Sequence, residues 1–325
     1  MARGAGRSAE VEAPAGSLPV SLAGVTKRYR GGRGIEDVDL QVAAGEVFAF
    51  LGPNGAGKTT TIRVMLDLIR PDAGSVRLFG LDVRSHSVDV RRRIGYLPGE
   101  LGLYEHLTAR ELLTHFAHLR GGPPWSVTAR LCEVFDLELD KVIGALSKGN
   151  RQKVGLVQAL MGEPDLLILD EPTSGLDPLV QAQVHDAIRR AALAGRSVFL
   201  SSHILSEVAG VASRVGIIKD GRMVGVERVS DLRRRAVHYV DVRFAGGIRP
   251  PELTGLAGVE VLAPVDDRVH LAVSGSLDPV LAVLASHPVE DLLVREPDLE
   301  DVLLSIIRGG RRAARGTGDL AGARR

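Results

Sequence analysis

One segment near the start of the chain has the residue types and spacing needed to hold a phosphate chain. GPNGAGKT, from Gly52 to Thr59, fits the pattern GxxxxGK[ST], in which glycines let successive backbone N–H groups face one anion. Lys58 can then reach the β- and γ-phosphates of a nucleotide, and the Thr59 hydroxyl can coordinate Mg²⁺. A plain glycine-rich turn is disfavoured, because an apolar strand pattern precedes the segment and a helical pattern follows it. The candidate phosphate-binding residues are Gly52, Pro53, Asn54, Gly55, Ala56, Gly57, Lys58, Thr59 and Thr60.

A second set of candidates lies at the end of the segment LLILDE. Its apolar residues predict a buried strand that ends in Asp170 and Glu171. Ligands of α/β sheets bind at the carboxyl ends of the strands. We therefore expect Asp170 to hold Mg²⁺, directly or through water, and Glu171 to polarise the water that attacks the γ-phosphate. Two acids after a strand can also simply begin a loop, but the phosphate-binding segment favours the catalytic interpretation.

A third cluster, LSKGNRQKVGL at residues 146–156, offers anion-binding groups where a helical pattern begins. Ser147, Lys148, Gly149 and Asn150 supply a hydroxyl, a cation, an unobstructed backbone and an amide. The cluster could be an ordinary helix N-cap, because serine is a favoured cap residue. It could equally be a surface that holds an anion at a helix N-terminus. The residues alone leave both interpretations open.

Apolar strands that alternate with helical patterns must position these residues, and this alternation predicts an α/β fold with a largely parallel sheet. The expected strands are 46–52, 166–170, 197–202 and 214–221. The expected helices are 58–69, 108–119, 150–161, 178–193 and 203–212.

The same patterns predict how the chain is divided. Residues 18–235 form the main nucleotide-binding domain, within which 85–146 is a mostly helical subdomain. After the arginine run in DLRRRA, alternating strands and a short helix at 298–307 indicate a small α/β domain over 236–308. The ends, 1–17 and 309–325, are rich in alanine, glycine and arginine and are expected to be disordered.

Composition limits the class of protein. A net charge of +1 gives no overall attraction to nucleic acid or anionic lipid, so no nucleic-acid partner is expected. The single cysteine, Cys132, excludes an internal disulfide and fits a reducing compartment. No apolar run is long enough to span a bilayer, and the first residues lack the apolar core of a signal peptide. We expect a cytoplasmic chain that would need another polypeptide to work across a membrane.

Taken in order, GPNGAGKT, LSKGNRQ, LLILDEP, SGLD and SSH resemble the motifs of the ATPase subunits of ATP-binding cassette (ABC) transporters. The resemblance covers about 18–235. The family signature is usually written LSGGQ; here Lys148 replaces its first glycine and Asn150 its glutamine. The resemblance implies a core with a mixed sheet and a helical subdomain, binding of ATP and Mg²⁺, and a head-to-tail dimer with a second copy or a homologue. In that dimer the signature segment of one subunit, here Ser147, Gly149 and Asn150, would cap the γ-phosphate held by the other.

Three more residues take roles from the resemblance. Tyr29, in TKRYRGG, stands where the family has an aromatic ring that stacks on adenine, although a lone tyrosine is more often a core residue. Asp177, in SGLD, resembles the residue that links the two active sites across the dimer. His203, in SSHILSE, resembles the switch histidine that contacts the γ-phosphate, which makes it a catalytic candidate beside Lys58 and Glu171.

One motif departs from the family. A glutamine usually follows a strand like IGYLP, but here Gly99 and then Glu100 follow it. A glycine has no side-chain amide for Mg²⁺ or water, so either Glu100 substitutes or the loop serves mainly in mechanical coupling. The adjoining stretch lies where the family meets its membrane partner, and its Leu103, Tyr104 and Leu107 are either partner contacts or core residues.

Within the family, LSKGNRQK, GYLPGELGLYEHLT and REPDLEDVLL resemble the separate ATPase subunits of drug and polysaccharide exporters, the daunorubicin-resistance type among them. This implies an ATPase at the cytoplasmic face of the membrane that drives a separately encoded integral-membrane permease. The alternative is a soluble ABC ATPase that acts on nucleic acid or ribosomes, which the lone cysteine and the lack of sustained heptads disfavour. A catalytically silent cassette is disfavoured by Glu171 and His203.

Overall fold

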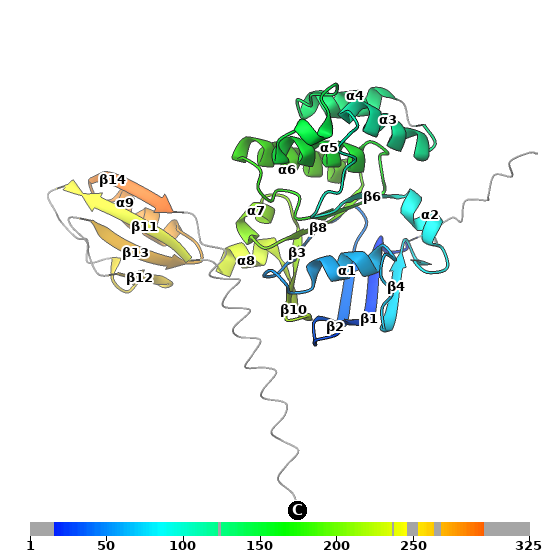
Figure 1. The fold of residues 1–325 in the computed structure, drawn as a ribbon. Helices are drawn as coiled ribbons and strands as arrows, with labels where there is room; N and C mark the ends of the chain where they lie inside the picture. The colour runs from blue at the N-terminus through cyan, green and yellow to red at the C-terminus, as the bar shows by residue number, and fades with distance from the viewer. Residues whose placement is uncertain (1–15, 123–124, 236, 246–252, 263–267, 296–325) are drawn as a thin grey trace, which may run out of the picture. The chain divides into compact units, whose positions relative to one another are not determined.

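The computed structural model describes residues 16–122, 125–235, 237–245, 253–262 and 268–295 (Figure 1). The chain divides into two compact units, the first ending at Val226 and the second beginning at Glu227, with residues 204–206 counted in the second. The second unit therefore begins earlier than the boundary expected at 236. The predicted tail 309–325, the helix at 298–307 and nearly all of the predicted tail 1–17 lie outside the described residues.

A six-stranded sheet in the order β10-β9-β3-β8-β7-β6 carries the candidate site. The neighbours from β9 through β6 pair in parallel, and every residue of β3, β7 and β8 is buried, as their unbroken apolar sequences predict. The strands are β3 (Val47–Leu51), β6 (Ile94–Leu97), β7 (Leu166–Asp170), β8 (Ser197–Ser202), β9 (Arg214–Lys219) and β10 (Arg222–Arg228).

Helices cover both faces of this sheet (Figure 1). On one face, α5 packs on β6 and α6 on β8, and α3 and α4 pack on α5. On the other face, α1 lies between the parallel sheet and a second, antiparallel sheet. The helices are α1 (Lys58–Met65), α2 (Ser87–Arg92), α3 (Ala109–Leu119), α4 (Trp125–Val134), α5 (Lys148–Leu160), α6 (Pro178–Leu193) and α7 (Leu205–Ala209), with a 3-10 turn η1 (Ile143–Ala145).

The antiparallel sheet, in the order β2-β1-β4-β5, was not among the predicted elements. Its strands are β1 (Val20–Arg28), β2 (Gly34–Val42), β4 (Ala73–Leu78) and β5 (Leu81–Asp82). The apolar face of this sheet and one side of α1 share a core that includes Val38, Ile62 and Leu78. The sheet thus clamps α1, and with it the phosphate-binding segment, against the parallel sheet.

The segment 85–146 is largely helical, as predicted, but it also contains β6, which pairs with β7. Helix α3 begins with a capping box: the Thr108 side chain accepts from the Glu111 backbone N–H, and the Glu111 carboxylate accepts from the Thr108 N–H. The strand brings residues 98–100, which follow it, beside the end of β7.

The second unit holds a four-stranded antiparallel sheet in the order β12-β13-β11-β14 and the helix α9. Val240, Leu271 and Val280 lie in its separate core. Its elements are α8 (Val229–Arg235), β11 (Val237–Phe244), β12 (Val259–Val261), β13 (Val269–Ser274), α9 (Asp278–Ala285) and β14 (Val289–Arg295).

Candidate nucleotide site

The segment Gly52–Thr59 forms a turn from the end of β3 into the N-terminus of α1, which is the context that the pattern requires. Gly57 is the N-cap residue of α1 and has a φ of 112°, a conformation that favours glycine. A Cβ at this position would also lie 2.6 Å from Cγ2 of Ile35. The antiparallel sheet therefore presses directly on the turn, and glycine is needed both for conformation and for space.

A chain of charged contacts joins the three predicted catalytic residues. The Lys58 ammonium donates to the Gly52 carbonyl at 2.6 Å and lies 3.1 Å from Oε1 of Glu171. The other carboxylate oxygen of Glu171 lies 2.8 Å from Nδ1 of His203. Lys58 is buried, whereas His203 is 40% exposed. Glu171 thus provides the anion that balances the buried Lys58 charge.

The end of β7 is held by a hydroxyl on the neighbouring strand. Ser201 of β8, paired with Asp170 in the parallel register, donates to Oδ1 of Asp170 at 2.5 Å. The Ser201 side chain also accepts from the backbone N–H of Glu171 at 3.1 Å. Glu171 has a φ of 51°, an uncommon conformation for a non-glycine residue and one that turns its side chain toward Lys58. Ser201 was missed as a site residue; the only signal for it in the sequence was its place at the end of the predicted strand 197–202.

Oxygen atoms suited to a magnesium ion converge at the same place. The Thr59 hydroxyl donates to Oδ2 of Asp170 at 2.9 Å, and the Asp170 side chain is buried. Both residues line a cavity of about 280 Å³, whose lining also includes Gly99, Glu100, Glu171 and His203. A Cβ on Gly99 would lie 3.4 Å from Oδ2 of Asp170, so this position abuts the carboxylate without supplying a ligand. Glu100 is exposed at the cavity wall.

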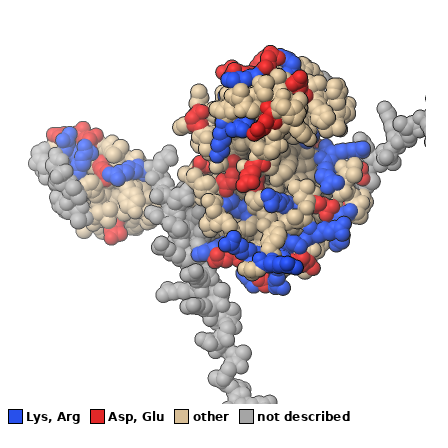
Figure 2. Space-filling view, in the orientation of Figure 1, with Lys and Arg blue, Asp and Glu red and all other residues tan. Residues whose placement is uncertain are grey.

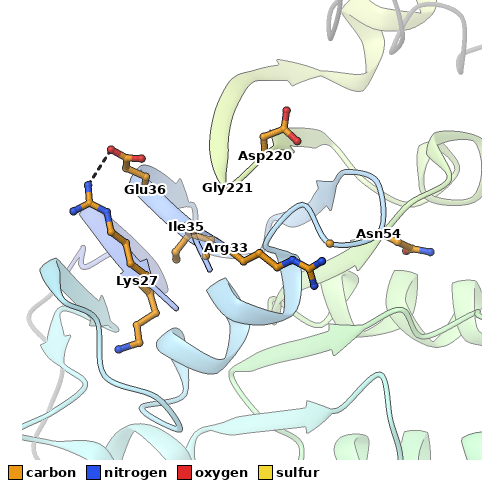
Figure 3. A pocket seen from close by; sticks show the side chains of 11 residues that line it. Lys27, Arg33, Ile35, Glu36, Asn54, Asp220 and Gly221 are labelled. Atoms are coloured by element: carbon orange, nitrogen blue, oxygen red, sulfur yellow. Dashed lines mark hydrogen bonds and ion pairs between the residues drawn. The ribbon is translucent and has the colours of Figure 1, made fainter. Parts of the chain in front are cut away.

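A second, larger cavity of about 630 Å³ lies on the other side of the phosphate-binding turn, and Asn54 lines both cavities. Figure 3 shows Arg33 extended toward the segment that carries Asn54. Glu36, which also lines this cavity, accepts from the Arg28 guanidinium at 3.2 Å. Arg33 is exposed and was also missed from the sequence. Tyr29 is 41% exposed, and its backbone N–H donates to the Arg33 carbonyl in the turn that forms the rim. Its ring is not part of the lining.

The predicted signature residues lie outside both cavities. Neither lining includes any of residues 147–150. Ser147 caps α5 by accepting from the Asn150 backbone N–H at 3.2 Å, which confirms the N-cap interpretation of this segment. Asp177 similarly caps α6 by accepting from the Val180 N–H at 3.0 Å. The structure therefore brings Thr59, Asp170, Glu171 and His203 together around one cavity. The signature residues and Asp177 lie outside both cavities on the same unit.

Across the parts of the chain that the structure describes, none of the helices has the length and apolarity needed to cross a bilayer. On the face shown in Figure 2, basic and acidic side chains are interspersed, in keeping with the net charge of +1.

Comparison with known proteins places this geometry in a family. The family model described as ABC transporter matches residues 35–174. The chain is 36% identical to the daunorubicin resistance ATP-binding protein DrrA3 of Streptomyces coeruleorubidus, over 90% of this chain and 97% of that protein. It is 33% identical to the bacitracin transport ATP-binding protein BcrA of Bacillus licheniformis, over 90% of this chain and 99% of that one.

Among solved structures, an ATP-binding subunit of an ABC transporter superimposes with a TM-score of 0.62 at 32% identity, covering 67% of this chain and 92% of that one. The phosphate-binding turn, the carboxylates at the end of β7 and the similarity along nearly the whole length of two relatives lead to one conclusion. The chain belongs to the ATP-binding subunits of ABC transporters, ATPases whose hydrolysis of ATP drives transport.

Proposed function

We propose that this chain is the motor of an exporter and drives a separately encoded integral-membrane permease from the cytoplasmic face of the membrane. The observation that carries the motor function is the contact of Lys58 with Glu171 and of Glu171 with His203 at the end of β7. The names of the relatives, which concern daunorubicin resistance and bacitracin transport, support export of a drug-like or amphiphilic compound.

In the proposed reaction, the backbone N–H groups of the turn and the Lys58 ammonium bind the β- and γ-phosphates. Glu171 then releases Lys58 and contacts the attacking water, whose proton it accepts as the water oxygen bonds to the γ-phosphorus. The bond between the γ-phosphorus and the β–γ bridging oxygen breaks, and ADP and phosphate leave. His203 keeps the carboxylate oriented through its contact with Oε2.

The oxygen donors also fit Mg²⁺, the ion that the family implies. Magnesium prefers hard oxygen ligands and keeps several of its waters, so one hydroxyl and one carboxylate are sufficient protein ligands. Thr59 and Asp170 would hold it, since their oxygens already meet at 2.9 Å and Asp170 is fixed by Ser201. When bound, the ion would neutralise phosphate charge. Glu100 is the nearest replacement for the missing glutamine, because it lies on the wall of the same cavity.

The larger cavity is proposed to hold the nucleoside. It adjoins the phosphate-binding turn through Asn54, and its rim is the turn that carries Tyr29. Because the Tyr29 ring is exposed and outside the lining, stacking on adenine requires the ring to swing over the base when nucleotide binds.

The separation of the signature segment from both cavities supports a site that is completed by a second copy of the chain. Ser147 and the Gly149 backbone are at a helix N-terminus, where an anion is favoured, but neither lines the cavity that holds Thr59 and Glu171. We propose that two copies pack head to tail with ATP between the turn of one and the signature segment of the other. Hydrolysis then releases the pair.

The proposal is tested by affinity purification of the tagged chain from detergent-solubilised membranes of its host, followed by mass spectrometry. Recovery of one polytopic protein with several hydrophobic spans is the expected result. A Lys58→Ala chain should recover the same protein, because the permease contact does not depend on nucleotide chemistry. Recovery of ribosomal or DNA-repair proteins without a membrane protein would contradict the assignment and favour the soluble ABC ATPase instead.

A further inference from the structure

Two contacts of equal length join the turn that begins at Glu171 to the segment that begins at His203. The first, already described, is between Oε2 of Glu171 and Nδ1 of His203 at 2.8 Å. In the second, the Thr173 hydroxyl donates to Oε2 of Glu207, also at 2.8 Å. Thr173 is two residues after Glu171, and Glu207 is four residues after His203. The two segments are thus joined once at the cavity and once away from it.

These contacts begin where the sheet ends. Strands β7 and β8 pair in parallel as far as Asp170 and Ser201, so beyond that point the ladder no longer holds the two segments together. The turn after β7 has its own backbone bonds. The Ser174 N–H donates to the Glu171 carbonyl at 3.2 Å and closes the turn. That bond fixes the shape of the turn, but it does not involve the segment that carries the histidine.

The contact between Thr173 and Glu207 is the better protected of the two. Thr173 is 4% exposed and Glu207 is half-buried, whereas the His203 side chain is 40% exposed. Within the described part of the chain, no lysine or arginine lies within ion-pair distance of the Glu207 carboxylate. A half-buried carboxylate needs a hydrogen-bond donor in place of the water that it loses, and the Thr173 hydroxyl is that donor.

We propose that Thr173 and Glu207 are positioning residues for ATP hydrolysis. Their contact holds the segment of His203 in place, and His203 in turn orients the catalytic carboxylate when this group leaves Lys58 for the attacking water. An exposed histidine can orient Glu171 only as far as its own position is fixed, and the buried Thr173 contact fixes it. This inference rests on the proposed roles of Glu171 and His203, and it adds a pair of residues that lie outside both cavities.

The rival explanation is purely structural. Glu207 lies in the first turn of α7, where a negative charge is favourable in any helix. The two explanations differ in their effect on the folded chain. A contact that only stabilises changes the unfolding temperature, whereas a positioning contact changes the rate of the folded chain at saturating ATP.

The experiment measures kcat and KM for ATP of the full chain with Mg²⁺, at two chain concentrations, together with thermal unfolding. Thr173→Val removes the hydroxyl and keeps the shape of the side chain, and Thr173→Ser retains the hydroxyl. Glu207→Met removes the acceptor, and Glu207→Gln retains an acceptor oxygen. Thr128→Val is the matched control, because Thr128 of α4 is fully buried and its hydroxyl has no hydrogen-bond partner among the described residues.

We expect Thr173→Val and Glu207→Met each to lower kcat about 10- to 100-fold, since a misplaced catalytic group is costly. KM should change little, because the phosphate contacts of Lys58 are untouched. The double variant should show the loss of one variant rather than the product of two. Its unfolding temperature should recover, because both polar partners are replaced by apolar groups. The two conservative variants and Thr128→Val should stay close to the parent.

Either single variant with the parent's kcat would overturn the inference. It would also be overturned by a kcat that recovers in the double variant together with the unfolding temperature, or in any variant at the higher chain concentration. The contact would then support only the fold or the dimer. A Glu171→Gln chain that hydrolyses ATP at the parent's rate would instead overturn the proposed base, so that failure of the proposed function is recognised separately.

Discussion

Replacing Glu171 with glutamine separates ATP binding from ATP hydrolysis, because the carboxylate has a different role in each state of the site. Its Oε1 lies 3.1 Å from Nζ of the buried Lys58, so the carboxylate balances the charge that would otherwise bind the phosphates of ATP. Glutamine preserves the size of the side chain and can still accept from Lys58, but it cannot take a proton from water. A general base contributes about 10²–10⁴-fold, so the hydrolysis rate should fall by about that factor.

ATP affinity should be preserved or rise in the same variant. Removing the carboxylate charge removes both the competing partner of Lys58 and a like charge beside the γ-phosphate. Glu171 is 21% exposed, and a contact of this kind is worth about 1 kcal/mol, or about fivefold in Kd.

The assay combines calorimetric titration with ATP and measurement of phosphate release in the presence of Mg²⁺. Glu163→Gln is the matched control, because Glu163 is an exposed carboxylate bonded to Arg196 away from both cavities. A Glu171→Gln chain that hydrolyses ATP at the wild-type rate would refute the assignment of the base. A chain that loses ATP binding would refute the inference that Glu171 competes with ATP for Lys58.

Three further predictions concern other parts of the chain. Lys58→Ala should weaken ATP binding by at least about 10–100-fold in calorimetry, since it removes a charge-assisted phosphate contact; unchanged affinity would exclude Lys58 from the site. Burial raises the pKa of the Cys132 thiol to about 11, so the native protein should react with a thiol reagent at pH 8 far more slowly than the urea-unfolded chain; equal rates would show that the thiol is accessible. Although burial alone would raise the pKa of Asp241, hydrogen bonds from His270 and Arg295 bring it below its ordinary value, so this carboxylate stabilises the fold above about pH 4 and the contribution is lost as the pH falls further. Asp241→Asn should therefore cost about 1–3 kcal/mol in urea unfolding at pH 7, followed by circular dichroism, with a smaller difference at pH 3; an equal loss at both values would contradict the charge argument.

The sequence allowed the turn between β3 and α1 and the buried strand that ends in Asp170 to be predicted, because each motif is contiguous and adjoins an unbroken apolar strand. It did not reveal the antiparallel sheet, since β1 contains register shifts against both β2 and β4, and its alternation is therefore irregular. Ser201 was missed for a different reason: its contact with Asp170 depends on which strands are neighbours, which no local pattern states.

The central claim, that one ATP site requires two chains, is tested most directly by mixing two inactive variants. Lys58→Ala has a defective phosphate-binding turn and an intact signature segment, and Ser147→Arg has the reverse defect. Each alone should be nearly inactive, whereas their mixture contains dimers in which one site is intact. Random pairing in a two-fold dimer predicts about a quarter of the wild-type ATPase rate. A mixture that hydrolyses ATP no faster than the sum of the two separate variants would contradict a site completed by the partner subunit.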